Sequence, residues 1–387
     1  MKRILHVIPT INPKYGGVSE AIRSLEVGFQ ALKTSKLAER HVLCLDNEEQ
    51  VNEWNNHGLI VHGIGSVNNF WQYHKDLYKW LKLNCENFDV IIVHGMWLYH
   101  SFAVYKAISF YNRNRTKCPT YYLMPHGMLD PWFQNDKSRK LKALRNDIYW
   151  FCIEKKVINN ASGLLFTCEQ ELILARRTFN GYKPKKELNV GLGIQSTPEF
   201  TNAMPPAIDN QPYWIFLSRI HEKKGVDLLI NAYKKLLVHN SQIPDLVIAG
   251  PMDSEYAQKM VILASGCQKI HFPGMLQGDK KWGALYGAEA FILPSHQENF
   301  GIAVVEALAC GIPVLISDQV NIWKEIKDGG AGLVEKDTQE GVLSLLEKWL
   351  ATDLSKQKIM AERATNVYKD HFDVEIVAKR LLEVIIK

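Results

Sequence analysis

Short apolar and β-branched runs recur along the chain and are separated by amphipathic stretches long enough for helices. This alternation is typical of parallel strands joined by crossover helices. In the first half the runs predict strands at Ile4–Pro9, His41–Leu45, Val90–His94, Thr120–Pro125 and Gly163–Thr167. In the second half they predict strands at Trp214–Ser218, Leu246–Gly250, Ile270–Phe272, Ala290–Pro294, Val314–Ser317 and Gly332–Val334. The pattern therefore predicts an α/β protein with two parallel sheets.

The stretch from Glu187 to Pro212 separates the two sets of strands and is rich in glycine, proline and short polar runs. Such a composition is typical of a linker, so we place a domain boundary near residue 192. The predicted domains span residues 1–192 and 193–372. The tail from Leu354 to Lys387 has a helical pattern, and its last part, about residues 373–387, has an apolar face that is compatible with packing back on the first domain.

The composition excludes disorder, because 47% of the 387 residues are hydrophobic. The formal net charge of +5 is compatible with an anionic ligand or an anionic membrane surface, although the excess is mild. The seven cysteines contain no C-x-x-C pair, which predicts neither a zinc cluster nor a disulfide framework. The N-terminal apolar run stops at Pro9, and the uncharged window Val90–Tyr105 is too short to span a membrane. We therefore expect a cytoplasmic protein.

The most informative stretch runs from Pro294 to Val314 and predicts a loop followed by a helix that Gly311 and Pro313 close. Glu306 lies in this helix among apolar neighbours, so its carboxylate needs a hydrogen-bonding partner. A ribose diol would suit it. The alternative is an ordinary structural partner, such as an arginine or a helix cap. The start of the helix would present backbone N–H groups to phosphate or sugar oxygens at Asn299, Phe300 and Gly301.

A second charged loop follows the predicted strand at Trp214–Ser218 and carries Arg219, Lys223 and Lys224, before Gly225 opens the next helix. Cations at such a turn can clamp a diphosphate and stabilise it as a leaving group. The alternative is a solvent-exposed basic turn. Arg219 and Glu298 both come just after predicted strands, where ligands bind in open α/β sheets, and this shared position favours a ligand site.

At these two places the sequence resembles glycosyltransferase family 4, whose members have the GT-B fold. The pattern E-x-F-G-x-x-x-x-E-A-x-A-x-G-x-P-V is present in full from Glu298 to Val314, and Arg219 is followed by Lys224-Gly225. The resemblance implies two Rossmann-like domains that face each other across a donor/acceptor cleft. It also implies a retaining reaction that requires no metal and no further cofactor.

The resemblance further assigns roles to the charged residues. Glu306 would hold the ribose of a nucleotide sugar, and Arg219 and Lys224 its diphosphate. Glu298 would bind the sugar hydroxyls together with the amides of Asn299, Phe300 and Gly301. Front-side attack requires no covalent nucleophile, and the position of Glu298 at the helix cap favours binding over such a role. The loop ending at Met275 would line the base.

In the first domain the resemblance implies that the loop Gly16-Gly17 approaches the phosphates and the acceptor, and that His126 lies beside the transferred sugar. A lone histidine is more often structural. Three places depart from the family pattern. Ser218 stands where a glycine is common, and the linker Gly191–Gln195 stands where the family often has Asn-Gly followed by an acidic residue. Val320-Asn321-Ile322 replaces a Gly-Gly near the sugar. The identity of the sugar is therefore poorly constrained.

Four residues at predicted strand ends are candidates for the acceptor side, since aromatic and polar groups there suit a sugar: His94, Trp97, Asp130 and Trp132. Ordinary aromatic packing is the alternative. Basic residues from Lys137 to Arg145 alternate with Leu141, Leu144, Ile148 and Trp150, which is the pattern of a basic amphipathic helix. Such a helix could contact anionic lipid, on the inner face of a membrane, or a lipid-diphosphate acceptor; a solvated helix surface is the alternative.

Taken together, the residues and the resemblance predict a retaining hexosyltransferase. Its donor would be a nucleotide diphosphate sugar, with a UDP-sugar such as UDP-glucose favoured. Its acceptor would be a glycan or a lipid-linked saccharide in polysaccharide biosynthesis. A nucleotide-sugar epimerase or phosphorylase of the same fold and a non-catalytic nucleotide-sugar sensor remain alternatives. A dehydrogenase is disfavoured because no G-x-G-x-x-G follows the first strand, and no nucleic-acid-binding module is present.

Overall fold

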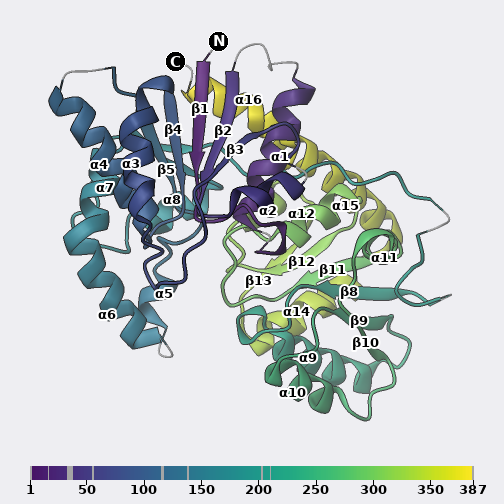
Figure 1. Cartoon of the computed structure of the whole chain (residues 1–387). Helices are drawn as coiled ribbons and strands as arrows, with labels where there is room; N and C mark the ends of the chain where they lie inside the picture. Colours follow the sequence, from purple (N-terminus) through teal and green to yellow (C-terminus); the bar gives the residue numbers. More distant parts are fainter. Residues whose placement is uncertain are drawn as a thin grey trace. The chain divides into compact units, whose positions relative to one another are not determined.

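The computed structural model describes residues 2–15, 17–32, 38–54, 56–114, 117–136, 139–201, 204–209 and 211–385 (Figure 1). Two residues of the predicted sites, Gly16 and Lys137, lie outside this described part. The chain divides into two compact units. The first comprises Met1–Gln195 and Val374–Lys387, and the second comprises Ser196–Asp373.

The first unit is built on a seven-stranded sheet in which every pair of neighbours is parallel, in the order β3-β2-β1-β4-β5-β6-β7. The strands are β1 (Lys2–Val7), β2 (Ala38–Cys44), β3 (Ile60–Gly63), β4 (Val90–His94), β5 (Thr120–Met124), β6 (Gly163–Phe166) and β7 (Glu187–Asn189). Every residue of β4 and β6 is buried, because helices cover both faces of a parallel sheet. This is why the central strands are continuous apolar runs in the sequence.

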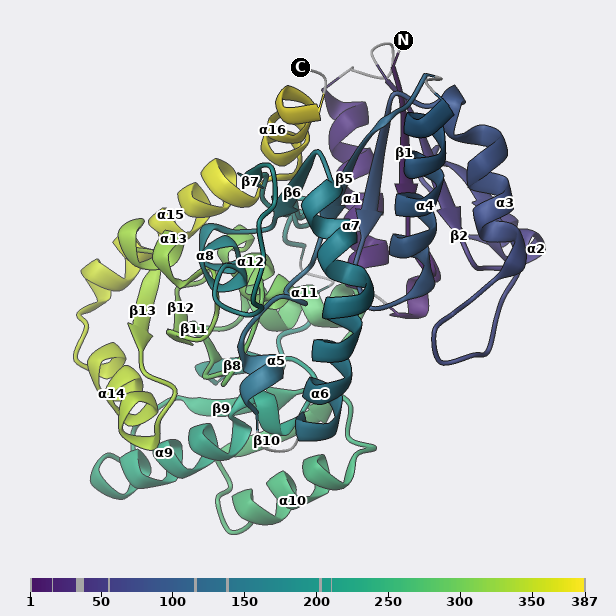
Figure 2. The ribbon, with the colours of Figure 1, turned by 90° about the vertical axis from the view of Figure 1, so that its left-hand side faces the viewer.

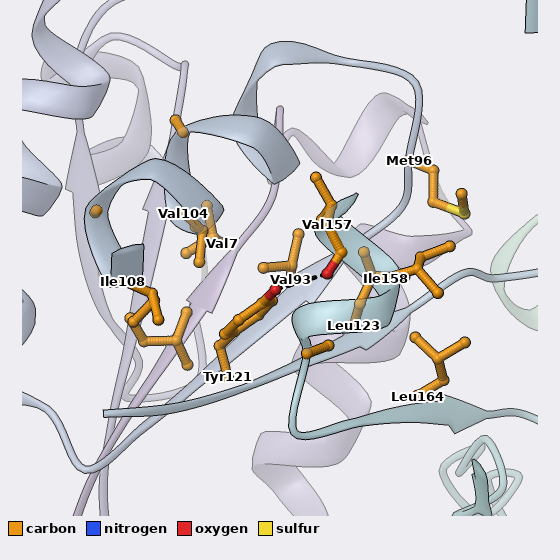
Figure 3. Close-up of a cluster of buried hydrophobic side chains, with 14 of the residues drawn as sticks. Val7, Val93, Met96, Val104, Ile108, Tyr121, Leu123, Val157, Ile158 and Leu164 are labelled. Carbon is orange, nitrogen blue, oxygen red and sulfur yellow. Dashed lines mark hydrogen bonds between the residues drawn. The ribbon is translucent and has the colours of Figure 1, made fainter. Parts of the chain in front are cut away.

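The helices of the first unit pack on both sides of this sheet. They are α1 (Val18–Ala31), α2 (Glu48–Glu53), α3 (Lys75–Asn84), α4 (Tyr99–Asn114), α5 (Trp132–Asn135), α6 (Lys140–Tyr149), α7 (Lys155–Asn160), α8 (Glu169–Ala175) and α16 (Val374–Ile385). The core on the side of α4 and α7 is shown in Figure 3, where the Tyr121 hydroxyl donates to the Val157 carbonyl at 2.6 Å. On the other side α16 packs against α1.

The second unit has a six-stranded parallel sheet in the order β10-β9-β8-β11-β12-β13. Its strands are β8 (Tyr213–Leu217), β9 (Asp245–Ala249), β10 (Ile270–Gly274), β11 (Ala290–Leu293), β12 (Val314–Ser317) and β13 (Gly332–Glu335). Its helices are α9 (Val226–His239), α10 (Glu255–Ala264), α11 (Gly278–Tyr286), α12 (Ile302–Ala309), α13 (Trp323–Asp328), α14 (Gln339–Leu350) and α15 (Leu354–Val367). The prediction of an α/β chain with two parallel sheets is confirmed.

In each sheet the strand order reverses at one point, between β1 and β4 in the first unit and between β8 and β11 in the second. The connections leave to opposite faces at such a switch point, and the gap outside the carboxyl ends of the two strands is where open α/β sheets bind ligands. The loops after β1, β4, β8 and β11 are therefore the expected ligand-binding loops.

Some details of the prediction were wrong. The stretch from Glu187 was interpreted as a linker, but its first three residues form the edge strand β7, and the edge strand β3 was missed. The predicted helical tail is confirmed, and the π-helical turn Tyr368–Phe372 divides it into α15 and α16. Trp150 does not share the outer face of α6 with Leu141, because its indole is buried and stacks on Phe179.

Candidate functional site

The loop after β8 carries the predicted diphosphate-binding cations. A single turn, Glu222–Lys224, connects it to α9, and Lys224 N donates to the His221 carbonyl at 2.8 Å. Gly225 then adopts φ +63°, and a Cβ atom there would lie 2.2 Å from the carbonyl oxygen of Pro294. A glycine is required at this position because it permits both the left-handed backbone and the close approach to the end of β11.

The loop after β11 contacts the first loop directly. Lys224 Nζ forms an ion pair with Glu298, and His296 N donates to the Lys223 carbonyl at 2.8 Å. The Lys224 and Glu298 side chains are only 10% and 21% exposed, so the pair is mostly shielded from water. The two sequence motifs are thus brought together at the switch point of the second sheet.

Backbone contacts fix the position of Glu298. Its N–H donates to the Gln319 carbonyl at 3.0 Å, and its own carbonyl accepts from Asn321 N at 2.9 Å. Gly301, with φ +82°, is the N-cap of α12, and the Phe300 ring is buried against Phe372. Any contact of Phe300 with a ligand would therefore come from its backbone. The segment that replaces the family's Gly-Gly pair lies along this loop, because Val320 bridges to Glu298.

Glu306 has a structural partner that the sequence did not reveal. Its Oε1 atom lies 2.9 Å from Nζ of Lys281 on α11, and the two side chains are 14% and 21% exposed. Lys281 Nζ also lies 3.8 Å from the centre of the Trp282 ring. The carboxylate therefore has a cation at one oxygen and retains acceptor capacity at the other.

Two other predicted donor residues are exposed and take no part in these ion pairs. Arg219 is exposed on the loop after β8, and Met275, just after the edge strand β10, is 62% exposed. Within the described ranges the structure provides no hydrogen bond or ion pair that joins either residue to Lys224, Glu298 or Glu306.

In the first unit three histidines from neighbouring strands form a hydrogen-bonded chain. His6 lies in β1, His94 ends β4 and His126 follows β5. His6 Nδ1 is 2.9 Å from His94 Nε2, and His94 Nδ1 is 3.0 Å from His126 Nε2. His100 Nε2 donates to the His94 carbonyl at 2.9 Å. Sequence analysis predicted His94 as an acceptor-side residue and His126 as a residue beside the transferred sugar, but it did not predict their contact. It did not identify His6 or His100 as site residues.

Burial keeps these imidazoles neutral. It lowers the pKa of His6, His100 and His126 to about 4 and that of His94 well below its usual value. The nearby His6 adds to the effect at His94. At neutral pH the cluster therefore offers uncharged donors and acceptors rather than a cation.

The histidines border two cavities. One, of about 210 Å³, lies at the carboxyl ends of β1 and β4 and is lined by residues that include Thr10, Ser19, His94 and His100. The other, of about 20 Å³, lies beside His6, His94 and His126 and has room for about one water molecule. His94 lines both cavities. Gly17, with φ +53°, immediately precedes α1, whose first turn contributes to the larger cavity.

A buried carboxylate holds the turn that carries His126. His126 and Gly127 have φ values of +53° and +81°. Gly127 N donates to Glu171 Oε1 at 2.5 Å, while Thr167 N and Oγ1 donate to Glu171 Oε2 at 2.8 and 2.6 Å. Glu171 is thus a positioning candidate that sequence reasoning missed.

The other acceptor candidates occupy structural positions. The Trp97 ring packs against Phe179, and the backbone N–H of Trp97 donates to Glu154 Oε1 at 2.9 Å. Asp130 is buried and accepts from Trp132 N at 2.8 Å. Trp97, Asp130 and Trp132 do not line the 210 Å³ cavity.

Among the described residues, no helix has both the length and the apolar character needed to cross a bilayer. The same residues contain no group of three or more His, Cys, Asp or Glu side chains arranged to hold a metal ion.

Comparisons with known proteins bear on both units. The model of the family described as glycosyl transferases group 1 matches residues 200–367. An uncharacterised glycosyltransferase of Methanocaldococcus jannaschii is 30% identical over 151 residues, which are 38% of this chain and 37% of that protein. Phosphatidyl-myo-inositol mannosyltransferase of Mycolicibacterium smegmatis is 28% identical over 173 residues, 44% of each chain. The chain thus spans less than half the length of the curated relatives that it matches.

A solved structure extends the likeness in fold to the whole chain. HepE of Anabaena, in complex with UDP and glucose, has a TM-score of 0.70 at 16% identity and covers 99% of both chains. Within the second unit, residues 200–367 include Lys224, Glu298 and Glu306 and the switch point at which they lie. Residues 200–367 of the second unit are therefore similar to the glycosyl transferases of group 1, and the chain as a whole has the GT-B fold.

Proposed function

We propose that this chain is a retaining glycosyltransferase that needs no metal. It would transfer a hexose from a UDP-sugar, such as UDP-glucose, to a glycan or a lipid-linked saccharide in polysaccharide biosynthesis. The observation that carries the proposal is the pair of shielded ion pairs, Lys224–Glu298 and Lys281–Glu306, in the unit that the family model matches. The likeness to HepE, whose structure contains UDP and glucose, supports the donor, and the mannosyltransferase relative supports the kind of reaction.

The proposed donor site follows from the charges of its residues. Lys224, with Arg219, would bind the diphosphate; its ammonium has three N–H donors and can serve Glu298 and a phosphate oxygen together. Glu298 and the amides of Asn299, Phe300 and Gly301 would bind the sugar hydroxyls.

The nucleoside would lie beside the second ion pair. Glu306 would accept hydrogen bonds from the ribose hydroxyls, with Lys281 holding its carboxylate in place. Met275 would contact the base. A carboxylate that already has one cation can accept from a diol without carrying an uncompensated buried charge.

The first unit would supply the remaining contacts. Gly16 and Gly17 would allow the backbone to approach the phosphates and the acceptor. His126 would hydrogen-bond the transferred sugar. The 210 Å³ cavity beside His94 is the best candidate for an acceptor hydroxyl group, with Trp97, Asp130 and Trp132 as outer contacts.

In the proposed reaction the bond between the anomeric carbon and the diphosphate oxygen breaks, and the acceptor oxygen bonds to the same face of that carbon. The acceptor proton passes to the departing diphosphate, whose charge Arg219 and Lys224 stabilise. Configuration is retained without a covalent intermediate on Glu298.

Donor turnover tests this proposal against its rivals. Purified protein is incubated with UDP-glucose and other UDP-sugars, with and without a saccharide acceptor, and the products are followed by NMR. Release of UDP that accelerates with acceptor, with the α-configuration kept, is the expected result. An epimerised UDP-sugar formed without acceptor would establish the epimerase, and binding without turnover would establish the sensor.

A matched pair of variants locates the activity. Lys224→Ala should abolish turnover, whereas Lys348→Ala removes a lysine of the same unit that is 57% exposed and pairs with Glu335. Equal losses in both variants would contradict the assignment of Lys224.

A further inference from the structure

One helical run of the first unit has two very different faces. The helices α6 and α7 are joined by the π-helical turn Trp150–Glu154, so the run continues from Lys140 to Asn160 (Figure 2). Its inner face is buried and contains Ala143, Asn146, Trp150 and Glu154. These residues recur every three or four positions, as expected for a helix that packs on a core along one side.

The outer face carries four large apolar side chains in water. Leu141, Leu144, Ile148 and Phe151 are 86%, 59%, 60% and 72% exposed. Their spacing of three, four and three residues places them in one stripe along the helix. A single exposed leucine needs no explanation, but a continuous apolar stripe marks a surface that binds something apolar.

Cations border this stripe. Residues 139–156 contain six of them and two acids, Asp147 and Glu154, which gives a formal charge of +4 out of +5 for the whole chain. Glu154 is fully buried, and burial raises its pKa to about 7, so it adds little negative charge to the surface. The cations beside the stripe are Lys140, Lys142, Arg145, Lys155 and Lys156. The sixth, Arg139, has a buried Nε atom and lies over the Phe133 ring. The mild excess of positive charge in the whole chain is thus concentrated in one segment.

Two neighbouring hollows are also lined by basic and aromatic side chains. One, of about 620 Å³, is lined by Phe151, Lys155 and Lys156 among others. The second, of about 570 Å³, shares Lys156 and extends over α4 to Lys106 and other aromatic and basic residues. No acidic residue lines either hollow. Shallow cationic hollows beside an apolar stripe suit anionic headgroups next to acyl chains.

We propose that this surface, the basic apolar face formed by Leu141, Leu144, Ile148 and Phe151 with the five neighbouring cations Lys140, Lys142, Arg145, Lys155 and Lys156, docks on an anionic phospholipid bilayer. The apolar stripe enters the acyl boundary while the lysines and Arg145 reach the headgroups. An acidic protein partner is less well matched, because the stripe protrudes from a helix instead of lining a groove. The proposal goes beyond the proposed function, since transfer to a soluble acceptor does not require a membrane.

Vesicle sedimentation with the full chain tests the proposal. The vesicles contain phosphatidylcholine alone, or phosphatidylcholine with about one third phosphatidylglycerol. The protein should sediment with the second kind and not with the first, and high salt should release it. Equal binding to both vesicles, or to neither, would overturn the proposal.

Paired variants identify the surface. Leu144→Ser with Ile148→Ser should weaken vesicle partitioning at least about tenfold. Lys142→Gln with Arg145→Gln should weaken it about 30-fold at low salt, because each cation near an anionic surface contributes roughly a fivefold factor. The matched controls lie in the second unit: Val238→Ser with Ile262→Ser, which are 82% and 71% exposed, and Lys235→Gln with Lys358→Gln. Each control should bind vesicles as the parent protein does.

Two further readouts separate the outcomes. Sedimentation velocity without lipid asks whether the stripe joins two copies of the chain; a dimer that Leu144→Ser with Ile148→Ser dissociates would replace the membrane proposal. UDP release from a UDP-sugar should be unchanged in the stripe variants. Loss of vesicle binding with normal turnover therefore tests this inference alone, whereas absent turnover in the parent protein would count only against the proposed function.

Discussion

The ion pair between Lys224 and Glu298 provides the sharpest test of the donor site, because its two halves have opposite expected effects. Both side chains are mostly shielded, at 10% and 21% exposure. Lys224→Met removes a cation that would bind the diphosphate and leaves the Glu298 carboxylate to repel it. Glu298→Gln removes only the competing anion, so the Lys224 ammonium becomes fully available to a phosphate oxygen.

The magnitudes follow from the shielding. A hydrogen bond to a charged group contributes about 1.5–3 kcal/mol, so Lys224→Met should weaken UDP binding roughly 10- to 150-fold. Glu298→Gln should leave UDP affinity unchanged or raise it, while hexose transfer falls. Each variant should also lose about 1–3 kcal/mol of unfolding free energy, between the values for exposed and fully buried pairs.

Calorimetric titration with UDP at fixed salt, on variants whose thermal unfolding is still cooperative, makes the comparison. Lys348→Met is the control, since it breaks an ion pair between Glu335 and a lysine that is 57% exposed, and it should leave UDP binding unchanged. If Lys224→Met and Glu298→Gln change UDP affinity in the same direction and by similar factors, the pair only supports the fold and the reasoning fails.

Four further predictions concern single residues. Glu306→Gln should weaken UDP binding about tenfold and leave inorganic diphosphate binding unchanged, because only the nucleoside would contact it. Gly225→Ala should cost several kcal/mol in denaturant unfolding, since the new Cβ would meet Pro294, whereas Gly266→Ala, which has open space around it and φ +79°, should cost only about 1 kcal/mol. Burial raises the pKa of Glu154 from 4.5 to about 7, so the folded state retains a proton that the unfolded chain releases. The free energy of unfolding should therefore fall by about 3 kcal/mol as the pH rises from 4.5 to about 7, and Glu154→Gln should remove this fall. NMR titration of His126 should show a neutral ring down to about pH 5, because burial lowers its pKa to about 4; a midpoint near 6.5 would contradict the buried placement.

The sequence predicts the fold well wherever burial imposes a continuous apolar run. The strand β12 was predicted with the bounds that the structure has, Val314–Ser317, because all four residues are buried. The missed strands, β3 and β7, are edge strands of four and three residues that contain no fully buried position. Edge strands are stabilised by one neighbour only, so their sequences need not be apolar.

The candidate site was predictable in part for a related reason. Lys224 and Glu298 are 74 residues apart, yet each follows a strand at the switch point, and their contact follows from the strand order. Lys281 was missed because the segment Gly278–Tyr286 begins with polar residues typical of any exposed helix start. Trp150 was assigned to the wrong face because hydrophobic spacing alone does not distinguish the edge of an outer stripe from the inner face of the same helix.

His6 was missed because its significance depends on partners from other strands. A histidine in a buried strand is ordinarily a core residue, and only the order β1-β4-β5 places its ring 2.9 Å from His94, 88 residues away. The sequence shows His6, His94 and His126 but not that they are neighbours, because their contact depends on the order of the strands in the sheet.

The two switch points differ in electrostatic character, and this difference supports the proposed division of roles. At the second switch point lysines are held near carboxylates with little exposure to water, which suits the charged diphosphate of a donor. At the first, burial keeps His6, His94 and His126 neutral, which suits the hydroxyl groups of sugars. A His126 with a pKa of about 4 is a poor general base near neutral pH, because the best base has a pKa close to the working pH. The acceptor proton would then have to pass to another group, and the departing diphosphate is the one that the proposed front-side reaction already provides.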